Sequence, residues 1–251
     1  MQPKGVKKIS DITLSVNRNS GYYFVLFFGL VLIAFWTSYF GKLGEPMETH
    51  VHLHGLAMTL WCVMLISQAF LIRWKKYALH RLIGKGSYLL VPFILYSGFH
   101  IARMTIRNMG IPGDALHYYF AALMFNSLLV FALFYGLAIA FRKKPALHSR
   151  WMVCTVFPLI TPVTDRIIYH YLDDLVPMVP TLHTVPMVQV IGFALADLIL
   201  LLLVAIDLLR HQRNYAFPIA LGVLLLYHLS VLTWYDVPAW QNIADWIMAL
   251  P

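Results

Sequence analysis

Long apolar runs recur along the whole chain and are separated by short polar stretches. The clearest extends from Gly55 to Ile72, about 18 residues without a charge, which is long enough to cross a bilayer as a helix. The pattern predicts seven such spans, at about 22–40, 54–73, 82–102, 117–141, 150–170, 185–209 and 216–235. Pro158 and Pro162 are expected to kink the fifth span. The sequence therefore predicts an all-α, polytopic membrane helical bundle.

Composition supports this prediction and divides the chain into three parts. Of the 251 residues, 60% are hydrophobic and 12% are charged, about half the charged share of a soluble domain. We expect a cytoplasmic tail at 1–20 and a membrane domain at 21–236. The last part, 237–251, places Trp240, Ile243, Ile247 and Leu250 at helical spacing, which predicts an interfacial amphipathic helix.

The positive charge is distributed unevenly between alternate loops. The N-terminal tail and loops 73–85, 142–150 and 210–213 hold 15 of the 19 Lys and Arg residues. This asymmetry predicts an amino terminus inside and a carboxyl terminus outside. The net charge of +8 thus reflects topology, with the lipid bilayer and not nucleic acid as the partner. Residues 1–20 show no cleavable signal peptide, which fits a bacterial inner (cytoplasmic) membrane.

Segments 54–88 and 117–152 look like two copies of one helix hairpin, within a repeat-containing core at 54–170. Each copy begins with a histidine at the outer end of a span, crosses a basic loop and opens the next span with a second histidine. The copies have the same direction, as in parallel repeats. His54 and His117 are expected at the outer level, and His80 and His148 at the inner level.

Paired imidazoles on neighbouring helices can ligate a haem iron from both faces. The leading hypothesis is a haem-binding protein for transmembrane electron transfer, with His54 paired with His117 and His80 paired with His148. Arginines at the two levels are candidates to hold the haem propionates: Arg103 and Arg166 outside, and Arg81 and Arg150 inside.

Two resemblances bear on this hypothesis. The blocks L-H-G…Q…L-H-R-L-I-G-K-G-S-Y and A-L-H-S-R-W-M…T-D-R-I resemble a family of predicted bacterial membrane proteins of unknown function, over about residues 50–170. That family has an H-R-x-x-G-x-x-Y block and a later H-R-R-W-M…R block.

The four histidines also resemble the di-haem core of the b-type transmembrane ferric reductase and ascorbate-oxidising cytochromes. This second resemblance implies haem b, oxidoreductase chemistry, and a redox partner protein or small-molecule electron donor. In those cytochromes the ligands lie within the spans, whereas His80 and His148 are expected at the edges of basic loops.

The histidines also allow a different reading. If residues 50–54 were extended, His50, His52 and His54 would share one face. With His100 and His117, and with Asp165 added, they would form an outer metal site for zinc, copper or iron. Such a site would make the chain a membrane-embedded metal-dependent enzyme. A third alternative is a non-enzymatic scaffold or accessory subunit.

Two further polar residues lie in the predicted spans. Asp197 is near the middle of the sixth span, and His228 is in the seventh. An ionisable residue at such depth is a functional candidate, because its burial is costly. Asp197 is expected to carry protons or to pair with a polar group such as Asn126.

Overall fold

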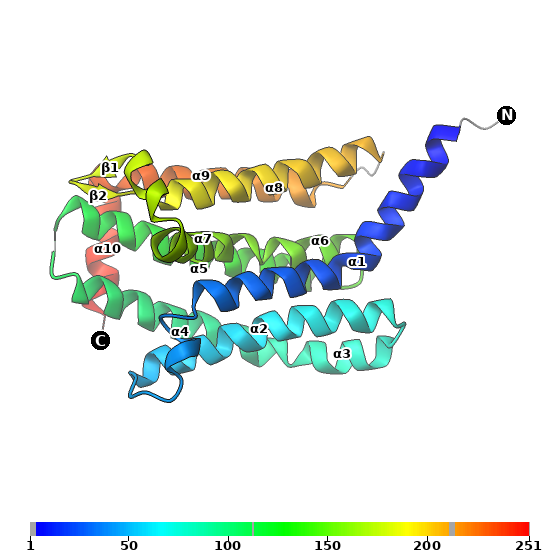
Figure 1. Ribbon diagram of the computed structural model, residues 1–251, viewed down its shortest axis with the longest axis horizontal. Coiled ribbons are helices and arrows are strands. Elements are labelled where there is room, and N and C mark those ends of the chain that lie inside the picture. Colours follow the sequence, from blue (N-terminus) through cyan, green and yellow to red (C-terminus); the bar gives the residue numbers. More distant parts are fainter. Residues whose placement is uncertain (1–3, 112, 211–213, 251) are drawn as a thin grey trace. The chain divides into compact units, whose positions relative to one another are not determined.

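The computed structural model describes residues 4–111, 113–210 and 214–250, with side chains from residue 19 onward (Figure 1). The chain forms two compact units. The first comprises Met1–Ile94 and Ala205–Arg213, and the second comprises Leu95–Val204 and Asn214–Pro251. Part of the expected tail, residues 1–3 and the side chains of 4–18, lies outside the described residues.

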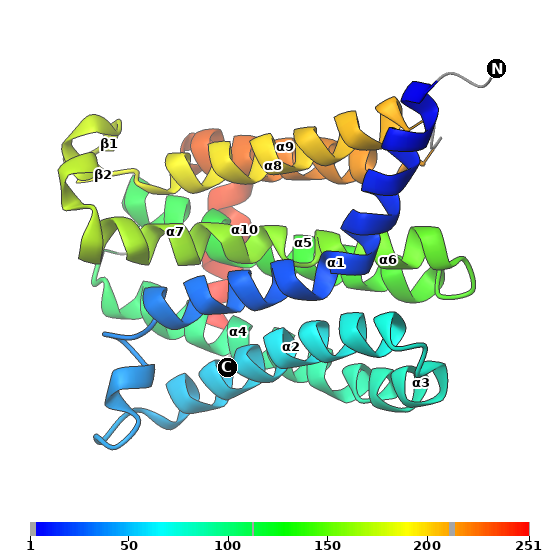
Figure 2. The same ribbon diagram turned by 45° about the vertical axis from the view of Figure 1, so that its right-hand side comes forward.

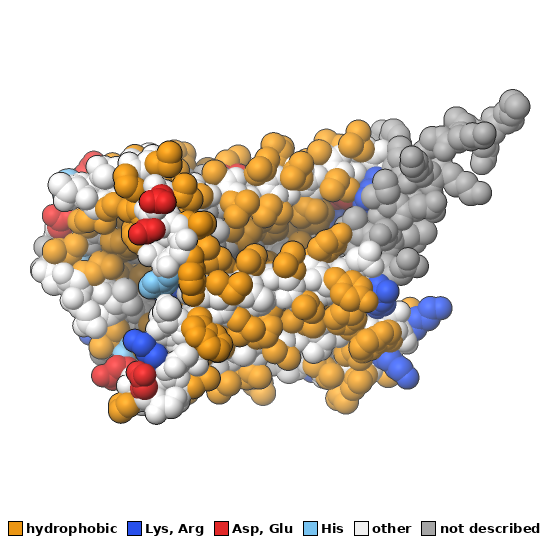
Figure 3. All heavy atoms as spheres, in the orientation of Figure 1, with side chains coloured by type: hydrophobic (Ala, Val, Ile, Leu, Met, Phe, Trp, Pro, Cys, Tyr) orange, Lys and Arg blue, Asp and Glu red, His pale blue; other side chains and the backbone are white. Residues whose placement is uncertain are grey.

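The first unit is built around a helix hairpin. Helix α2 (Thr49–Arg73) is followed by a short turn at 74–76 and by α3 (Tyr77–Lys85). Helix α1 (Lys4–Ala34) packs on α2, and a short 3-10 helix, η1 (Phe40–Lys42), lies between them. Helix α4 (Ser87–Asn108) starts in this unit and continues into the second. Lysine and arginine side chains gather at the turn between α2 and α3 (Figure 3).

The second unit has α5 (Ala115–Ala140) at its centre. Helix α6 (Pro145–Cys154) and α9 (Ala216–Thr233) both pack on α5, and α7 (Phe157–Tyr171) contacts it as well. Helix α8 (Gln189–Leu209) runs beside α9 in both views of the ribbon (Figure 1 and Figure 2). The centre of α5 is apolar and tightly packed, since Ala121, Ala122 and Phe134 are fully buried.

The fifth span was expected to kink near its outer half, whereas the structure has a break between α6 and α7, in the inner half of the predicted span. The helix is interrupted at Thr155 and Val156, and α7 begins at Phe157 with Pro158 in its first turn. A proline there is tolerated because a first-turn amide has no partner within the helix. Pro162 then lies inside α7.

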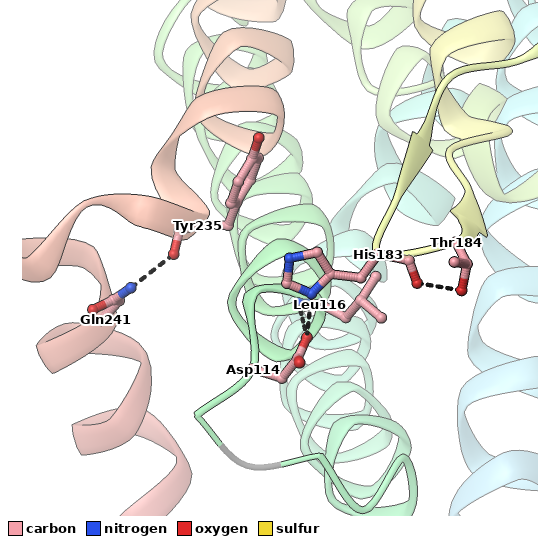
Figure 4. Close-up of polar contacts among 6 residues, drawn as sticks. All are labelled: Asp114, Leu116, His183, Thr184, Tyr235 and Gln241. Atoms are coloured by element: carbon pink, nitrogen blue, oxygen red, sulfur yellow. Dashed lines mark hydrogen bonds and ion pairs between the residues drawn. The ribbon is translucent and has the colours of Figure 1, made fainter.

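A two-stranded hairpin follows α7 and the 3-10 helix η2 (Asp173–Met178). Strand β1 (Thr181–Leu182) pairs antiparallel with β2 (Val185–Pro186), and both turn residues, His183 and Thr184, have positive φ. Two-residue hairpin turns need that conformation. The turn points His183 at Asp114, with 3.5 Å between Nδ1 and Oδ1 (Figure 4). Asp114 also caps α5 by accepting from the Leu116 amide at 2.8 Å.

The expected C-terminal helix is present as α10 (Pro238–Ala249), preceded by the 3-10 helix η3 (Trp234–Asp236). Helix α10 crosses the direction of α5 (Figure 1). The Trp240 indole donates to the Tyr118 carbonyl at 3.0 Å, and Gln241 donates to the Tyr235 carbonyl (Figure 4). The face toward the unit holds Trp240 and Ala244, whereas Ile243 is 50% exposed.

Six described helical segments are long and apolar enough to cross a membrane, which identifies an integral membrane protein: Thr49–Arg73, Tyr77–Asn108, Ala115–Ala140, Pro145–Tyr171, Gln189–Leu209 and Ala216–Asp236. Helices satisfy their own backbone hydrogen bonds, as lipid requires. Hydrophobic side chains cover much of the visible face (Figure 3). The expected first span corresponds to a shorter apolar helix, Asn19–Ala34, which ends before Phe40.

Helices α7 and α8 lie close together at Gly192, and this generates a stability prediction. A Cβ at Gly192 would lie 3.0 Å from the Thr161 Cα, a backbone atom that cannot move aside easily. We expect Gly192→Ala to lower the free energy of unfolding by about 1–3 kcal/mol. In the matched control Gly136→Ala, no described atom lies within 4 Å of the new Cβ, so stability should be unchanged or slightly higher. Thermal unfolding in detergent measures both variants, and equal melting temperatures would contradict the close approach.

Candidate functional site

The structure repeats one helical pattern, once in each unit. A long helix (α2 or α5) is followed by a basic turn, and then by a short helix (α3 or α6) that is interrupted before the next helix. In both copies the short helix carries Ala-Leu-His at its second to fourth positions, so His80 and His148 occupy equivalent places. Both histidines therefore lie within helices, and not at the edges of loops as expected.

His148 is anchored in an orientation suited to a ligand. Its Nδ1 lies 2.8 Å from the carbonyl oxygen of Ala138 on α5. A carbonyl only accepts hydrogen bonds, so Nδ1 carries a proton in this contact. Histidines that bind metals commonly have their other ring nitrogen fixed in this way.

The other predicted inner residue, His80, lies in a hairpin with an unusual polar neighbour. Gln68 of α2 lies opposite Gly84 of α3, and a Cβ on Gly84 would be 3.6 Å from Gln68 Oε1. Gly84 follows His80 by one helical turn, so the two residues share a face of α3. Both amide atoms of Gln68 are buried and have no hydrogen-bond partner among the described residues.

The three alternating histidines do not adopt the extended conformation that the metal hypothesis required. Residues 50–54 belong to α2, where successive residues are 100° apart, so only His50 and His54 share a face. The His52 ring instead packs against Tyr39, at 5.9 Å between ring centroids. The Tyr39 ring also covers Gly55, where a Cβ would collide with it.

The remaining members of that proposed metal set, His100 and His117, lie in the second unit and differ in burial. His117 is buried near the start of α5, with its ring edge-on to Tyr118, whereas His100 on α4 is exposed. Over the described ranges, no three His, Cys, Asp or Glu side chains come close enough together to hold a metal ion.

The candidate propionate-binding arginines make other contacts. Arg103 is buried and donates from NH2 to the carbonyls of Met248, at 3.2 Å, and Leu250, and Arg107 donates to Met248 at 2.8 Å. These two arginines therefore satisfy the carbonyls at the end of α10.

The other three members of the arginine set differ in exposure. Arg150 is buried, donates to the Ala146 carbonyl and lies over the Phe217 ring. Arg166 donates to the Pro162 carbonyl within α7. Arg81 is exposed on α3.

Asp197 and His228 form a pair between α8 and α9. His228 Nδ1 lies 3.0 Å from Asp197 Oδ2, and the Phe193 ring stacks on the imidazole at 4.1 Å. The His228 side chain is 6% exposed and that of Asp197 is 24% exposed. The suggested partner Asn126 instead donates to Ser230 at 2.9 Å. The sequence singled out both members of the pair, but their contact depends on the packing of α8 against α9.

This unit has a second polar contact between helices, and the sequence did not indicate which helices it would join. Tyr119 on α5 donates to Gln189 Oε1 on α8 at 3.0 Å. Asp165 lies on α7. Asp165 Oδ1 is buried without a hydrogen-bond partner in the described part of the chain. The sequence shows a polar residue in each of three spans, but this pattern does not indicate which of the three helices are in contact.

Comparison with known proteins adds no assignment. No protein family matches the chain, and no curated protein or solved structure matches it.

The Asp197–His228 contact predicts energetic coupling between the two residues. Asp197→Leu and His228→Phe should each lower the free energy of unfolding. The double variant should lower it by about 0.5–2 kcal/mol less than the sum of the two single effects. A cycle pairing Asp197→Leu with Ser149→Ala, which is exposed on α6, should be additive. Chemical unfolding in mixed micelles measures both cycles, and additivity in the first would contradict the contact.

The Arg103 contacts predict that this residue stabilises the last turn of α10. Arg103→Leu removes the charged donor of the Leu250 carbonyl and leaves the Met248 carbonyl with Arg107 alone, at a cost of about 1–3 kcal/mol. We expect faster amide exchange in residues 246–250, followed by mass spectrometry in detergent. Arg142→Leu removes an exposed arginine with a 3.3 Å contact inside its own segment and should leave that exchange unchanged. Equal amide exchange rates in Arg103→Leu and in the native protein would show that the Arg103 hydrogen bonds do not stabilise the end of α10.

Proposed function

We propose that this chain is a haem-binding protein for transmembrane electron transfer. The observation that carries the proposal is the repeated long helix, basic turn and short helix, with a histidine near the start of the long helix and another at the fourth position of the short helix. Each unit thus has one histidine near each end of its hairpin. Two haems at different membrane depths would each need two such histidines, one from each unit.

The topology belongs to the same proposal. Seven spans, with Asn19–Ala34 as part of the first, place the amino terminus inside and the carboxyl terminus outside. The basic turns 74–76 and 141–144, with Lys75, Lys76, Arg142, Lys143 and Lys144, then face the cytoplasm. A bacterial inner membrane fits this orientation. His80 and His148 are then at the inner level, and His54 and His117 at the outer level.

The residues present fit the requirements of a haem. His148 offers Nε2 because its Nδ1 is fixed by the Ala138 carbonyl. His80 holds the equivalent position in the other copy. The pairs His54 with His117 and His80 with His148 join residues of the two units, and they stay a prediction. A bound haem would supply one-electron chemistry, and the protein would hold the iron and exclude lipid from it.

The contacts of the arginines narrow their proposed roles. Arg103 donates hydrogen bonds to the end of α10, so Arg166 is the stronger candidate to bind an outer propionate. At the inner level Arg81 is exposed and Arg150 lies over Phe217. Electrons would come from a redox partner protein or a small-molecule donor on one side and leave to an acceptor on the other.

The optical spectrum tests the proposal directly. Protein purified from haem-sufficient cells should show a Soret band and, after dithionite reduction, an α band. His80→Ala and His148→Ala should each reduce the haem-to-protein ratio by about half, and combining them should cause no further loss, because they share one haem. His54→Ala with His80→Ala should remove both haems.

His183→Ala is the control, since this histidine is exposed at the hairpin turn. It should keep the native spectrum and the native haem-to-protein ratio. Native protein without haem bands overturns the proposal.

A further inference from the structure

The α2–α3 hairpin of the first unit carries a group of exposed cations. Two lie in the turn and two lie four residues apart on one face of α3: Lys75, Lys76, Arg81 and Lys85. None of them makes an ion pair with a carboxylate among the described residues. No acidic residue occurs between Glu48 and Asp114, so this part of the chain supplies no counter-charge of its own. The four charges are therefore available to an anion from outside the chain.

An apolar stripe lies beside these cations on the same helix. Its members recur at three- and four-residue spacing and are all exposed: Leu79, Leu82 and Ile83. Leu82 is 66% exposed. Because successive residues are 100° apart around a helix, Leu82 is next to Lys85 in the circular order of side chains. Helix α3 thus presents a cationic face and an apolar face side by side.

The equivalent helix of the second unit is covered by protein. Helix α6 packs on both α5 and α9, and it buries four side chains: Leu147, Arg150, Trp151 and Cys154. Helix α3 packs on α2, and none of its residues is buried. The short helix is therefore a packed element in one unit and an uncovered one in the other.

The level of α3 in the membrane identifies what covers it. Two candidate spans, Thr49–Arg73 and Tyr77–Asn108, meet at the turn 74–76. A turn between two spans lies at the level of the lipid headgroups, whichever way the hairpin is oriented. Trp74 and Tyr77 are exposed there, as is usual for aromatic residues at a membrane interface. Lipid phosphates and acyl chains therefore both reach this place.

A second copy of the chain fits the same surface less well. In an isologous dimer the same patch occupies both sides of the interface. The four cations of one copy would then approach the four cations of the other, with no carboxylate from 49–113 to separate them. Like charges placed together in this way oppose association. A ligand with a negative head and an apolar body has no such conflict.

We propose that α3 and the turn 74–76 bind an anionic phospholipid. Its phosphate contacts the cationic face that includes Arg81 and Lys85, and its acyl chains cover the apolar stripe that includes Leu82. Clusters of Lys and Arg next to a span are suited to anionic headgroups. The inference goes beyond the proposed function and does not depend on haem binding.

Lipid titration followed by native mass spectrometry tests the inference. Delipidated full-length protein in detergent is titrated with dioleoylphosphatidylglycerol or with dioleoylphosphatidylcholine, which has no net charge. The native protein should bind the first lipid more tightly. The double variant Arg81→Gln, Lys85→Gln should weaken that binding by roughly 10- to 30-fold at low ionic strength, because two charges near the phosphate are lost. Leu82→Gln should weaken it several-fold, because the acyl chains lose apolar contact.

Each test variant has a matched control. The double variant Lys143→Gln, Lys144→Gln removes two exposed cations from the basic turn of the second unit, where the following helix is packed. Leu129→Gln changes a leucine of α5 that is 67% exposed. Both controls should keep the native affinity within about twofold. Melting temperature in detergent checks that each variant is folded, and if one test variant unfolds, the other decides.

Four results would overturn the inference. The first is equal affinity of the native protein for the two lipids. The second is an equal loss of affinity in the two double variants, which would show only a general attraction to surface charge. The third is a loss in Arg81→Gln, Lys85→Gln with none in Leu82→Gln, which would indicate a site for an anion without acyl chains. The fourth is a native dimer that Leu82→Gln dissociates, because that face would then join two copies.

Discussion

A polar group that is buried between apolar helices must find its partner inside the protein, because lipid offers none. In the second unit this constraint links the helices in pairs: Tyr119 to Gln189, Asn126 to Ser230, and Asp197 to His228. Each bond joins two different helices. The bonds therefore fix which helices lie together and at what depth, which apolar contacts alone specify poorly.

The same constraint separates residues with structural roles from those available for chemistry. Arg103 is buried, where a guanidinium without hydrogen bonds would be costly, and it donates to the carbonyls of Met248 and Leu250 at the end of α10. His148 has its Nδ1 fixed by the Ala138 carbonyl. Gln68 has neither amide atom satisfied within the described residues.

The repeated hairpin explains why such groups recur at matching places. In both copies a basic turn follows a long apolar helix, and a short helix then carries the Ala-Leu-His sequence. The short helix ends just before Gly86 in one copy and at Cys154, ahead of Pro158, in the other. A duplicated element of this kind places equivalent imidazoles in each unit without requiring the rest of the chain to be symmetric.

The sequence by itself determined the helical class, the positions of the apolar segments and the C-terminal helix, because these depend on local composition and spacing. It also identified His80, His148, Asp197 and His228 as unusual. It misjudged residues 50–54, where helix formation from Thr49 replaced the assumed extended conformation.

Only the tertiary structure decided the partners: His228 and not Asn126 for Asp197, the end of α10 for Arg103, and the Gly84 face for Gln68. A hydrogen bond between residues distant in sequence depends on which helices meet and on their rotation about their axes. Neither quantity is encoded in the pattern of any single segment.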